Sequence, residues 1–344
     1  MNASWIVLIL VISLLAALLA MRWLAQPLLR LLLALRYRLV VVGREHIPRR
    51  GPVLIAANHV SWLDGLFLAA GCPRRGHALV NRSYIDWPVL GWWARWIGLI
   101  PVPYRGPKAQ RAMIEACRRV LDDGEALGIF PEAQISRTGL TGPFHRGLEV
   151  ILAGRDHVPV IPAFLDNLWG SVFSYAGGRF FAKAPQGLRR TVVLAFGPPV
   201  PPPVTAFSVR QAVLEAGVKA FELRDRTTPL PDTIDPTLPG LHHPELGPLT
   251  GSTPDFNRDG IRQQGHKPGA WGLPLPGVAL RVVGDSGIPL PPETPGRIQA
   301  LVAGRPGWTE TGWVGSIDRD GFIRLADSTP PAAAANPAGQ LHRT

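Results

Sequence analysis

A histidine and a carboxylate follow a short apolar run near residue 60. The run 53–57 is followed by Asn58 and His59, and Asp64 comes five residues after His59. An imidazole can act as a general base near neutral pH, and a carboxylate on its other nitrogen fixes the tautomer. The same residues suit a strand-to-helix turn, in which Ser61 caps a helix and Asp64 lies in its first turn. This stretch alone leaves both interpretations open.

A pair of this kind needs a rigid frame, and the pattern on either side predicts one. Between Tyr37 and about Arg226, short apolar runs alternate with helical patterns. We expect strands over 39–42, 53–57, 78–80, 99–102, 126–130, 158–164 and 191–196, and helices over 62–70, 87–98, 107–123, 145–154 and 207–226. Apolar strands that alternate with helices predict an α/β sheet with helices on its faces.

Two further charged side chains follow apolar strands of this frame. Arg105 comes just after the run 99–102, and Glu132 comes just after 126–130 and a proline. In α/β sheets, ligands bind beyond the carboxyl ends of the strands. We therefore expect His59, Arg105 and Glu132 to meet at one edge of the sheet.

The charge of the chain is concentrated in its first two thirds. Residues 1–228 hold 27 Lys and Arg against 14 Asp and Glu, whereas residues 229–344 hold 9 against 11. Most of the cations are arginines, which suit phosphate in lipid head groups or in nucleic acid, although genomic composition explains them equally well. The two cysteines indicate neither a disulfide framework nor a metal site, so a reducing compartment is the default.

The first 34 residues predict attachment to a membrane. Residues 4–21 carry no charge and are long enough to cross a bilayer. No cation precedes them, whereas arginines follow at 22, 30, 36 and 38, which predicts that the rest of the chain faces the cytoplasm from the inner membrane. Residues 28–38 after Pro27 are typical of a second helix that lies on the membrane, or of a buried globular helix.

Residues 35–226 resemble the PlsC-like glycerophospholipid acyltransferase family. That family's first block, Asn-His-x4-Asp, is met by His59 and Asp64, and the arginine that ends its second block is met by Arg105. Its third block is met by Phe130, Pro131 and Glu132, and its fourth, an apolar strand with proline, by residues 158–162. All four blocks occur in order.

The third block departs from the family pattern, because Ala133, Gln134 and Ile135 stand where Gly-Thr-Arg is usual. The segment is more similar to the acyltransferase half of the bifunctional 2-acylglycerophosphoethanolamine acyltransferase and acyl-carrier-protein synthetase. Without that arginine, Arg137 is a substitute for binding the acceptor's phosphate, or else a solvated loop residue.

The last third of the chain differs in composition from the rest. Residues 227–249 are rich in proline and are expected to form a linker, residues 250–328 a small β-rich unit, and residues 329–344 a disordered tail. Residues 250–328 resemble a fragment of AMP-forming acyl-adenylate synthetases. That family's Thr-Gly-Asp is Thr311-Gly312-Trp313 here, and no lysine follows Lys267. The resemblance thus implies a fragment without adenylation activity.

The resemblance implies acyl transfer from acyl-carrier protein or acyl-CoA to the hydroxyl of a lysophospholipid, at a membrane, without cofactor, metal or nucleic acid. His59 and Asp64 would be catalytic; the substrate would be bound by Asn58, Ser61, Arg105, Glu132 and Arg137. Trp87, Trp92, Trp93 and Trp96 suit an acyl groove, a membrane interface or a core. One alternative is a lipid hydrolase, which the absence of a G-x-S-x-G elbow weakens. Another is a non-catalytic lipid-binding scaffold.

Overall fold

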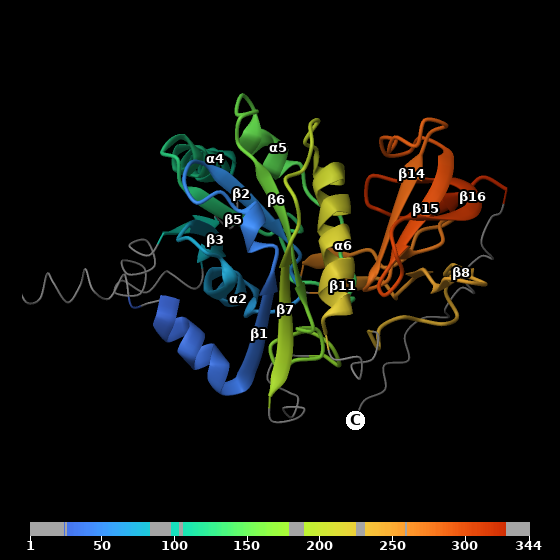
Figure 1. Cartoon of the computed structure of the whole chain (residues 1–344), viewed down its shortest axis with the longest axis horizontal. Coiled ribbons are helices and arrows are strands. Elements are labelled where there is room, and N and C mark those ends of the chain that lie inside the picture. Colours follow the sequence, from blue (N-terminus) through green and yellow to red (C-terminus); the bar gives the residue numbers. More distant parts are fainter. Residues whose placement is uncertain are drawn as a thin grey trace, which may run out of the picture.

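Seven strands form one mixed sheet in the computed structural model, which describes residues 24, 26–82, 98–102, 106–178, 189–224, 231–258 and 260–327. The strands lie side by side in the order β1-β7-β6-β2-β5-β3-β4 (Figure 1). Every neighbouring pair is parallel except β6 and β7. The bounds are β1 Tyr37–Val42, β2 Val53–Ala57, β3 His77–Asn81, β4 Leu99–Val102, β5 Ala126–Ile129, β6 Val160–Asp166 and β7 Arg190–Phe196. The predicted α/β sheet is confirmed.

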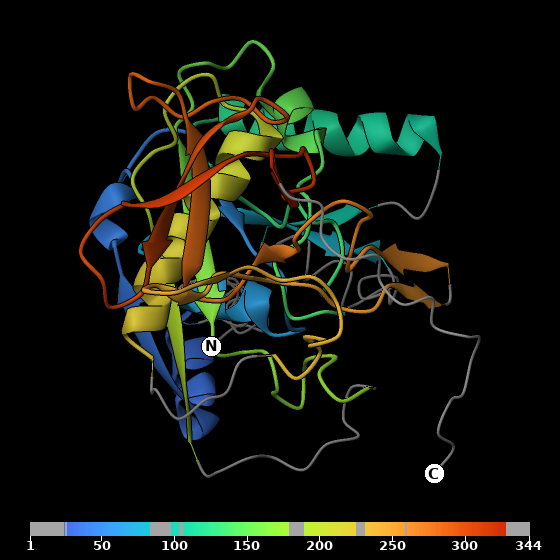
Figure 2. The same cartoon turned by 90° about the vertical axis from the view of Figure 1, so that its right-hand side faces the viewer.

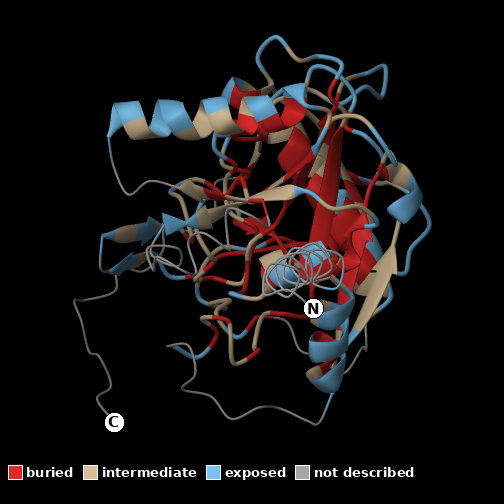
Figure 3. Ribbon diagram, turned by 90° about the vertical axis from the view of Figure 1, so that its left-hand side faces the viewer, coloured by how far each residue is buried: buried red, intermediate tan, exposed pale blue. Residues whose placement is uncertain are grey.

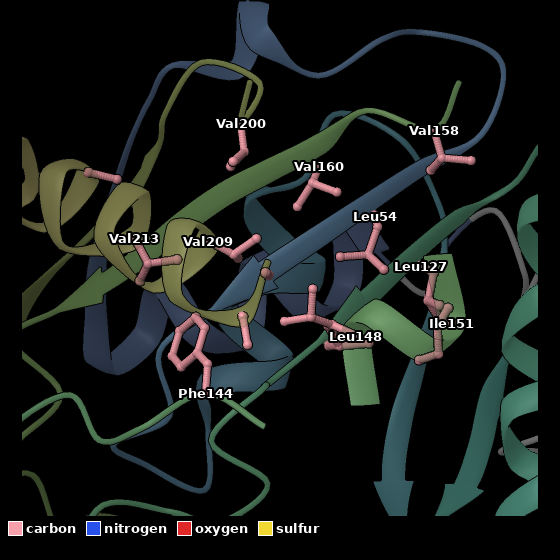
Figure 4. Packing of buried hydrophobic residues seen from close by; sticks show 14 of the residues in the cluster. Leu54, Leu127, Phe144, Leu148, Ile151, Val158, Val160, Val200, Val209 and Val213 are labelled. Carbon is pink, nitrogen blue, oxygen red and sulfur yellow. The ribbon is translucent and has the colours of Figure 1, made fainter. Parts of the chain in front are cut away.

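Helices cover both faces of this sheet because successive strand residues point to opposite sides. On one face, Leu54, Leu127 and Val160 pack with helices α4 (Pro107–Asp122), α5 (Gly147–Leu152) and α6 (Ala206–Glu222) (Figure 4). On the other face, Val53 and Ile161 pack against α2 (Asp64–Gly71). The sheet is therefore the most buried layer (Figure 3).

Helix α6 joins the sheet to the C-terminal unit. It begins at a capping box, in which Thr205 Oγ1 accepts the Ser208 N–H and Ser208 Oγ accepts the Thr205 N–H. One side packs on β6 and β7, and the other packs on β14 (Figure 1). Leu214 and Val218 of the helix form a small apolar cluster with Ala279. The two parts of the chain thus share one helix.

The C-terminal unit is an antiparallel sheet with three short two-stranded ladders (Figure 2). Its strands are β8 His242–His243, β9 Gly247–Pro248, β10 Thr250–Gly251, β11 Phe256–Arg258, β12 Ile261–Gln263, β13 Leu273–Pro274, β14 Val278–Val283, β15 Gly296–Val302, β16 Thr309–Ile317 and β17 Ile323–Leu325. Leu241, Leu246 and Leu249 are buried in its core. The unit therefore begins before residue 250, inside the stretch expected to be a linker, because leucines spaced among the prolines anchor it.

The helical residues 26–36 lie against the C-terminal end of α2. Gln26 Nε2 donates to the carbonyls of Ala69 and Cys72 at 2.9 Å, and Arg30 Nε donates to that of Ala70 at 2.7 Å. Another part of this helix is exposed and apolar, and we call its exposed leucines the leucine stripe: Leu24, Leu28, Leu31, Leu32 and Leu35. The expectation of an entirely buried globular helix is excluded by this exposure.

Several expectations fall outside the described residues: the membrane span over 4–21, the helix over 87–98 with its four tryptophans, and the tail 329–344. Within the described parts of the chain, the helices are all too short or too polar to cross a bilayer.

Candidate active site

His59 and Asp64 are in direct contact at the carboxyl end of β2. His59 Nδ1 lies 2.8 Å from Asp64 Oδ2, and the Asp64 side chain is fully buried whereas that of His59 is 20% exposed. Asp64 is the first residue of α2, so the five-residue turn folds the carboxylate back onto the imidazole. With Nδ1–H donating to Asp64, Nε2 is the ring nitrogen that can accept a proton.

The turn holds the Asp64 carboxylate with two further donors. The N–H groups of Val60 and Ser61 donate to the same Oδ2 at 2.6 and 2.8 Å. Burial raises the pKa of Asp64, and the hydrogen bonds from His59, Ser61 and Val60 oppose that rise. Three donors on one oxygen favour the ionised carboxylate, which is the form that stabilises a protonated imidazole.

The imidazole is also held from its face. The ring of Phe130, which follows β5, is stacked on that of His59 with centroids 4.3 Å apart and planes 19° from parallel. The sequence motif alone assigned Phe130 no role of its own. Its contact fixes the plane of the ring, while Asp64 fixes its rotation.

Ser61 belongs to the turn, and its expected contact with substrate stays a prediction. The residue is fully buried, and its Oγ accepts the Leu63 N–H at 3.1 Å. Helix α2 begins at Asp64, two residues later than a cap at Ser61 requires. The N–H groups of residues 60–64 all have partners inside the turn or on Phe173. These amides are therefore not the oxyanion site that a helix beginning near Ser61 would supply.

The Asn58 side chain joins two strands, and its expected contact with substrate stays a prediction. Its Nδ2 donates to the carbonyl of Leu165 at 3.1 Å, and its Oδ1 accepts the N–H of Leu165 at 2.7 Å. Both ends of the amide are thus used on β6, and the side chain is buried. Asn58 fixes the position at which β2 ends and His59 begins.

Glu132 holds the backbone of His59. Its Oε1 accepts the His59 N–H at 2.8 Å, and its Oε2 accepts the Gly142 N–H at 2.9 Å. The carbonyl of His59 accepts the Ser136 N–H at 2.7 Å, so both backbone groups of His59 are bound by the segment after β5. The carboxylate was expected to bind glycerol hydroxyls or Arg105. The structure gives it the task of positioning His59.

Ala133 explains part of the departure in the third motif. Its φ is 55°, in the left-handed region that glycine adopts without strain. Alanine adopts this conformation at a cost of about 1 kcal/mol. The backbone that presents Glu132 is therefore retained although the glycine is replaced.

The segment after β5 borders a cavity of about 240 Å³ shared with the C-terminal unit. The residues that line it include Glu132, Gln134, Ser136, His145, Arg262 and Asp320. Glu132 is nevertheless almost completely buried, and this burial raises its pKa to about 7, against the opposing hydrogen bonds from Gly142 and His59.

The raised pKa of Glu132 predicts that the protein loses stability as the pH rises. Between the ordinary value of 4.5 and about 7, the folded chain holds a proton that the unfolded chain has lost. Stability from this group is therefore fully present below pH 4.5 and is lost through pH 7. Relative to Glu132→Gln, the free energy of unfolding should fall by roughly 3 kcal/mol over this interval. Urea unfolding of the wild type and of Glu132→Gln at about pH 5 and about pH 8 measures this difference. The same change of stability with pH in both proteins would contradict the prediction.

Arg137 lies between two aromatic rings. Its guanidinium carbon is 3.0 Å from the centroid of Tyr175 and 4.8 Å from that of Phe256 in the C-terminal unit. The backbone N–H of Arg137 donates to Gln263 Oε1 at 2.6 Å, and Gln263 also belongs to the C-terminal unit. The structure thus places Arg137 at the junction of the two parts. Arg105 lies outside the described residues.

Arg210 of α6 was not among the predicted site residues, yet its guanidinium is buried and binds the carbonyls of Thr141 and Gly142. A signal was present, because Arg210 interrupts a helix face of buried apolar residues such as Val213 and Leu214. No group of three potential metal ligands occurs within the residues that the structure describes.

Comparison with known proteins gives one family match. Residues 38–166 match the family model described as Acyltransferase. The 1-acyl-sn-glycerol-3-phosphate acyltransferase of Bacillus subtilis is 29% identical over 39% of this chain and 66% of its own. The lyso-ornithine lipid O-acyltransferase of Rhizobium meliloti is 30% identical over 45% of this chain and 52% of its own. The structure of PlsC from Thermotoga maritima has a TM-score of 0.47 at 20% identity, covering 60% of this chain and 83% of the other.

The matches cover only part of each protein. The chain spans between 36% and 66% of the length of the first curated relatives that it matches. The closer relationship to the bifunctional acyltransferase and synthetase stays a prediction. Over residues 38–166, which contain His59, Asp64 and Glu132, the resemblance to the glycerophospholipid acyltransferases is supported by the family model and the curated relatives.

Proposed function

We propose that this protein is a membrane-associated O-acyltransferase, which moves a fatty acyl group from a thioester to a hydroxyl of a lysophospholipid or lysophosphatidate. The observation that carries the proposal is the 2.8 Å contact between His59 Nδ1 and the buried Asp64. The acyltransferase match over residues 38–166 supports it, as do relatives named for transfer to 1-acyl-sn-glycerol 3-phosphate and to lyso-ornithine lipid.

The proposed reaction needs a base and no enzyme nucleophile, because a thioester is already activated. His59 Nε2 takes the proton of the acceptor hydroxyl as its oxygen attacks the thioester carbonyl carbon. Asp64 stabilises the imidazolium that forms. The tetrahedral intermediate then collapses, the carbon–sulfur bond breaks, and the thiolate takes the proton from His59. The products are the ester and a free thiol.

The substrates follow from the resemblance. Arg105 matches the family arginine that binds the acceptor's phosphate, and we assign it that role. The donor is acyl-carrier protein or acyl-CoA. The C-terminal unit is proposed to lack adenylation activity, because Trp313 of β16 stands at the position of the ribose-binding aspartate and packs against the core and the His243 ring.

The proposal is tested by supplying the full chain in membranes with radiolabelled acyl-CoA or acyl-carrier protein and a panel of lysophospholipids. A labelled diacyl lipid that depends on both substrates is the expected product. Release of free fatty acid at the same rate with and without acceptor would instead identify a hydrolase. No turnover of either thioester with any acceptor would favour a non-catalytic lipid-binding protein.

The leucine stripe supports the membrane part of the proposal. The five residues are between 53% and 75% exposed, and they recur at intervals of one to four residues. Gln26 and Arg30 of the same helix bind carbonyls at the end of α2. Burial of one leucine is worth about 1.5–3 kcal/mol, so the stripe favours an apolar environment. We propose that it lies in the head-group region of the inner membrane, with the sheet on the cytoplasmic side.

An environment-sensitive fluorophore can report where the stripe lies. Attached to Leu31→Cys, the dye should shift its emission to the blue when vesicles containing anionic lipid are added, because the residue enters the interface. The control is Ile288→Cys in the C-terminal unit, which is similarly exposed, at 65% against 62%. Burial raises the pKa of Cys117 to about 11 and also raises that of Cys72, so the native thiols are poorly reactive. Equal shifts at both positions would contradict the assignment.

A further inference from the structure

Arg210 is the largest fully buried side chain among the residues that the structure describes, at 1% exposure. Its Nε donates to the carbonyl of Gly142, and its Nη2 donates to that of Thr141, both at 2.8 Å. Its Nη1 is buried without a hydrogen-bond partner. Burying a guanidinium is costly because its charge loses its hydration, and hydrogen bonds offset that cost only where every donor has a partner.

The two carbonyls that Arg210 binds belong to the segment that holds Glu132. The Gly142 N–H donates to Glu132 Oε2 at 2.9 Å, and Glu132 Oε1 accepts the His59 N–H at 2.8 Å. Three hydrogen bonds therefore connect the guanidinium on α6 to the backbone of His59. The positive charge also favours the ionised form of Glu132, whose two oxygens accept these amides.

The other side of Arg210 is covered by the C-terminal unit. Gly321 lies directly against the guanidinium, and a Cβ at this position would collide with Nη1. The turn that carries Gly321 is well fixed: Asp318 Oδ1 accepts the N–H groups of Asp320 and Phe322, at 3.0 and 2.9 Å. Lys267 Nζ binds the carboxylates of Asp318 and Asp320 at 2.7 and 2.5 Å. The turn closes the pocket in which the guanidinium lies.

We propose that Arg210 is a positioning residue for His59, and that the turn 318–321 of the C-terminal unit is needed to hold it in place. The inference rests on the proposed acyl transfer for its kinetic consequence. It assigns the C-terminal unit a structural part in the acyltransferase site. The sequence resemblance implied only that this unit lacks adenylation activity and assigned it no part in the acyltransferase site.

The neighbouring residue on α6 provides a matched control. Gln211 Nε2 donates to the carbonyl of Leu280 on β14 at 2.7 Å, so it also joins the helix to the C-terminal unit. Its bond has no part in the segment 141–142. Gln211→Ala should therefore loosen the junction without moving Glu132. Gly287→Ala is the control for Gly321→Ala, because Gly287 also has positive φ, at 75°, and open space around its Cβ position.

The variants Arg210→Gln, Arg210→Lys and Gly321→Ala should lower kcat while leaving KM for both substrates nearly unchanged. A displacement of about 1 Å at a catalytic group costs roughly 10²-fold, and we expect a loss of 10- to 100-fold for Arg210→Gln. Arg210→Lys should recover part of it, because an ammonium can donate to one of the two carbonyls. Gln211→Ala and Gly287→Ala should keep the wild-type kcat.

Hydrogen exchange of the same full-length variants gives a readout that does not require catalysis. The amides of His59 and Gly142 should exchange faster in Arg210→Gln and Gly321→Ala, and at the wild-type rate in Gln211→Ala. Wild-type kcat and exchange in both Arg210→Gln and Gly321→Ala would overturn the inference, as would an equal loss of kcat in Gln211→Ala. A wild-type protein without transferase activity would contradict the proposed function, and the exchange rates would then decide this inference alone. If Arg210→Gln does not fold, Gly321→Ala and Arg210→Lys decide it.

Discussion

Replacing His59 by alanine should lower the rate of acyl transfer by about 10²–10⁴-fold, the loss typical of a missing general base. The acceptor hydroxyl would then have to lose its proton to water. The side chain of His59 makes its polar contact with Asp64 only through Nδ1, and its ring is partly exposed. The fold should therefore persist. Initial rates with one acceptor and one donor, together with the thermal unfolding midpoint, measure both effects.

His157→Ala is the matched control for His59→Ala. This exposed histidine precedes β6, which runs parallel to β2, so it lies at the opposite edge of the sheet from His59. The control should transfer at the wild-type rate. Full activity in His59→Ala, with the same acceptor and donor, would show that the proposed mechanism is wrong.

Asp64→Asn should lower kcat by roughly 10²–10³-fold. The asparagine carbonyl can take the place of Oδ2 and keep all three donors, so the tautomer of His59 is retained. The negative charge beside the imidazolium is lost. For two unit charges about 4 Å apart, the attraction is worth on the order of 4 kcal/mol at an effective dielectric constant of about 20. The NH2 group of the asparagine would take the place of Oδ1, which is buried without a hydrogen-bond partner. The variant should therefore also lose some stability.

Kinetics and stability must be measured on the same preparation of Asp64→Asn. If Asp64 only shaped the start of a helix, the variant protein would lose stability and keep its turnover per folded molecule. Asp122→Asn is the comparison, because Asp122 is an exposed carboxylate in an ion pair with Arg155. A normal kcat for folded Asp64→Asn would remove Asp64 from the mechanism.

The strands were predictable because their signal is local. Each of the seven strands of the large sheet ends within two residues of its predicted bounds, since a buried strand is a short apolar run between polar turns. Strand β16 is harder to predict from sequence, because its first half, Thr309 to Trp313, has no apolar alternation. The order of the strands and the antiparallel pairing of β6 with β7 depend on contacts between distant segments, which no local pattern encodes.

The difference between local patterns and contacts with distant segments also decides which parts of the site were predictable. His59 and Asp64 are five residues apart, so one tight turn brings them together, and the local sequence offers this pair as one of two interpretations. The partners of Glu132 and Asn58 lie up to 107 residues away, and they are backbone groups, which every residue carries. Sequence patterns name side chains with suitable chemistry. They do not show that a carboxylate will accept hydrogen bonds from the backbone N–H groups of the chain itself.

If the protein acts at a membrane as proposed, the contact between the helical residues 26–36 and the far end of α2 would set the height of the reaction above the lipid. Arg30 binds the carbonyl of Ala70, and Asp64 starts the same helix six residues earlier, a rise of about 9 Å. The polar layer of a bilayer leaflet is about 5–8 Å thick. With the leucine stripe in that layer, the acceptor needs to rise by only a fraction of its length, and its acyl tail stays in hydrocarbon.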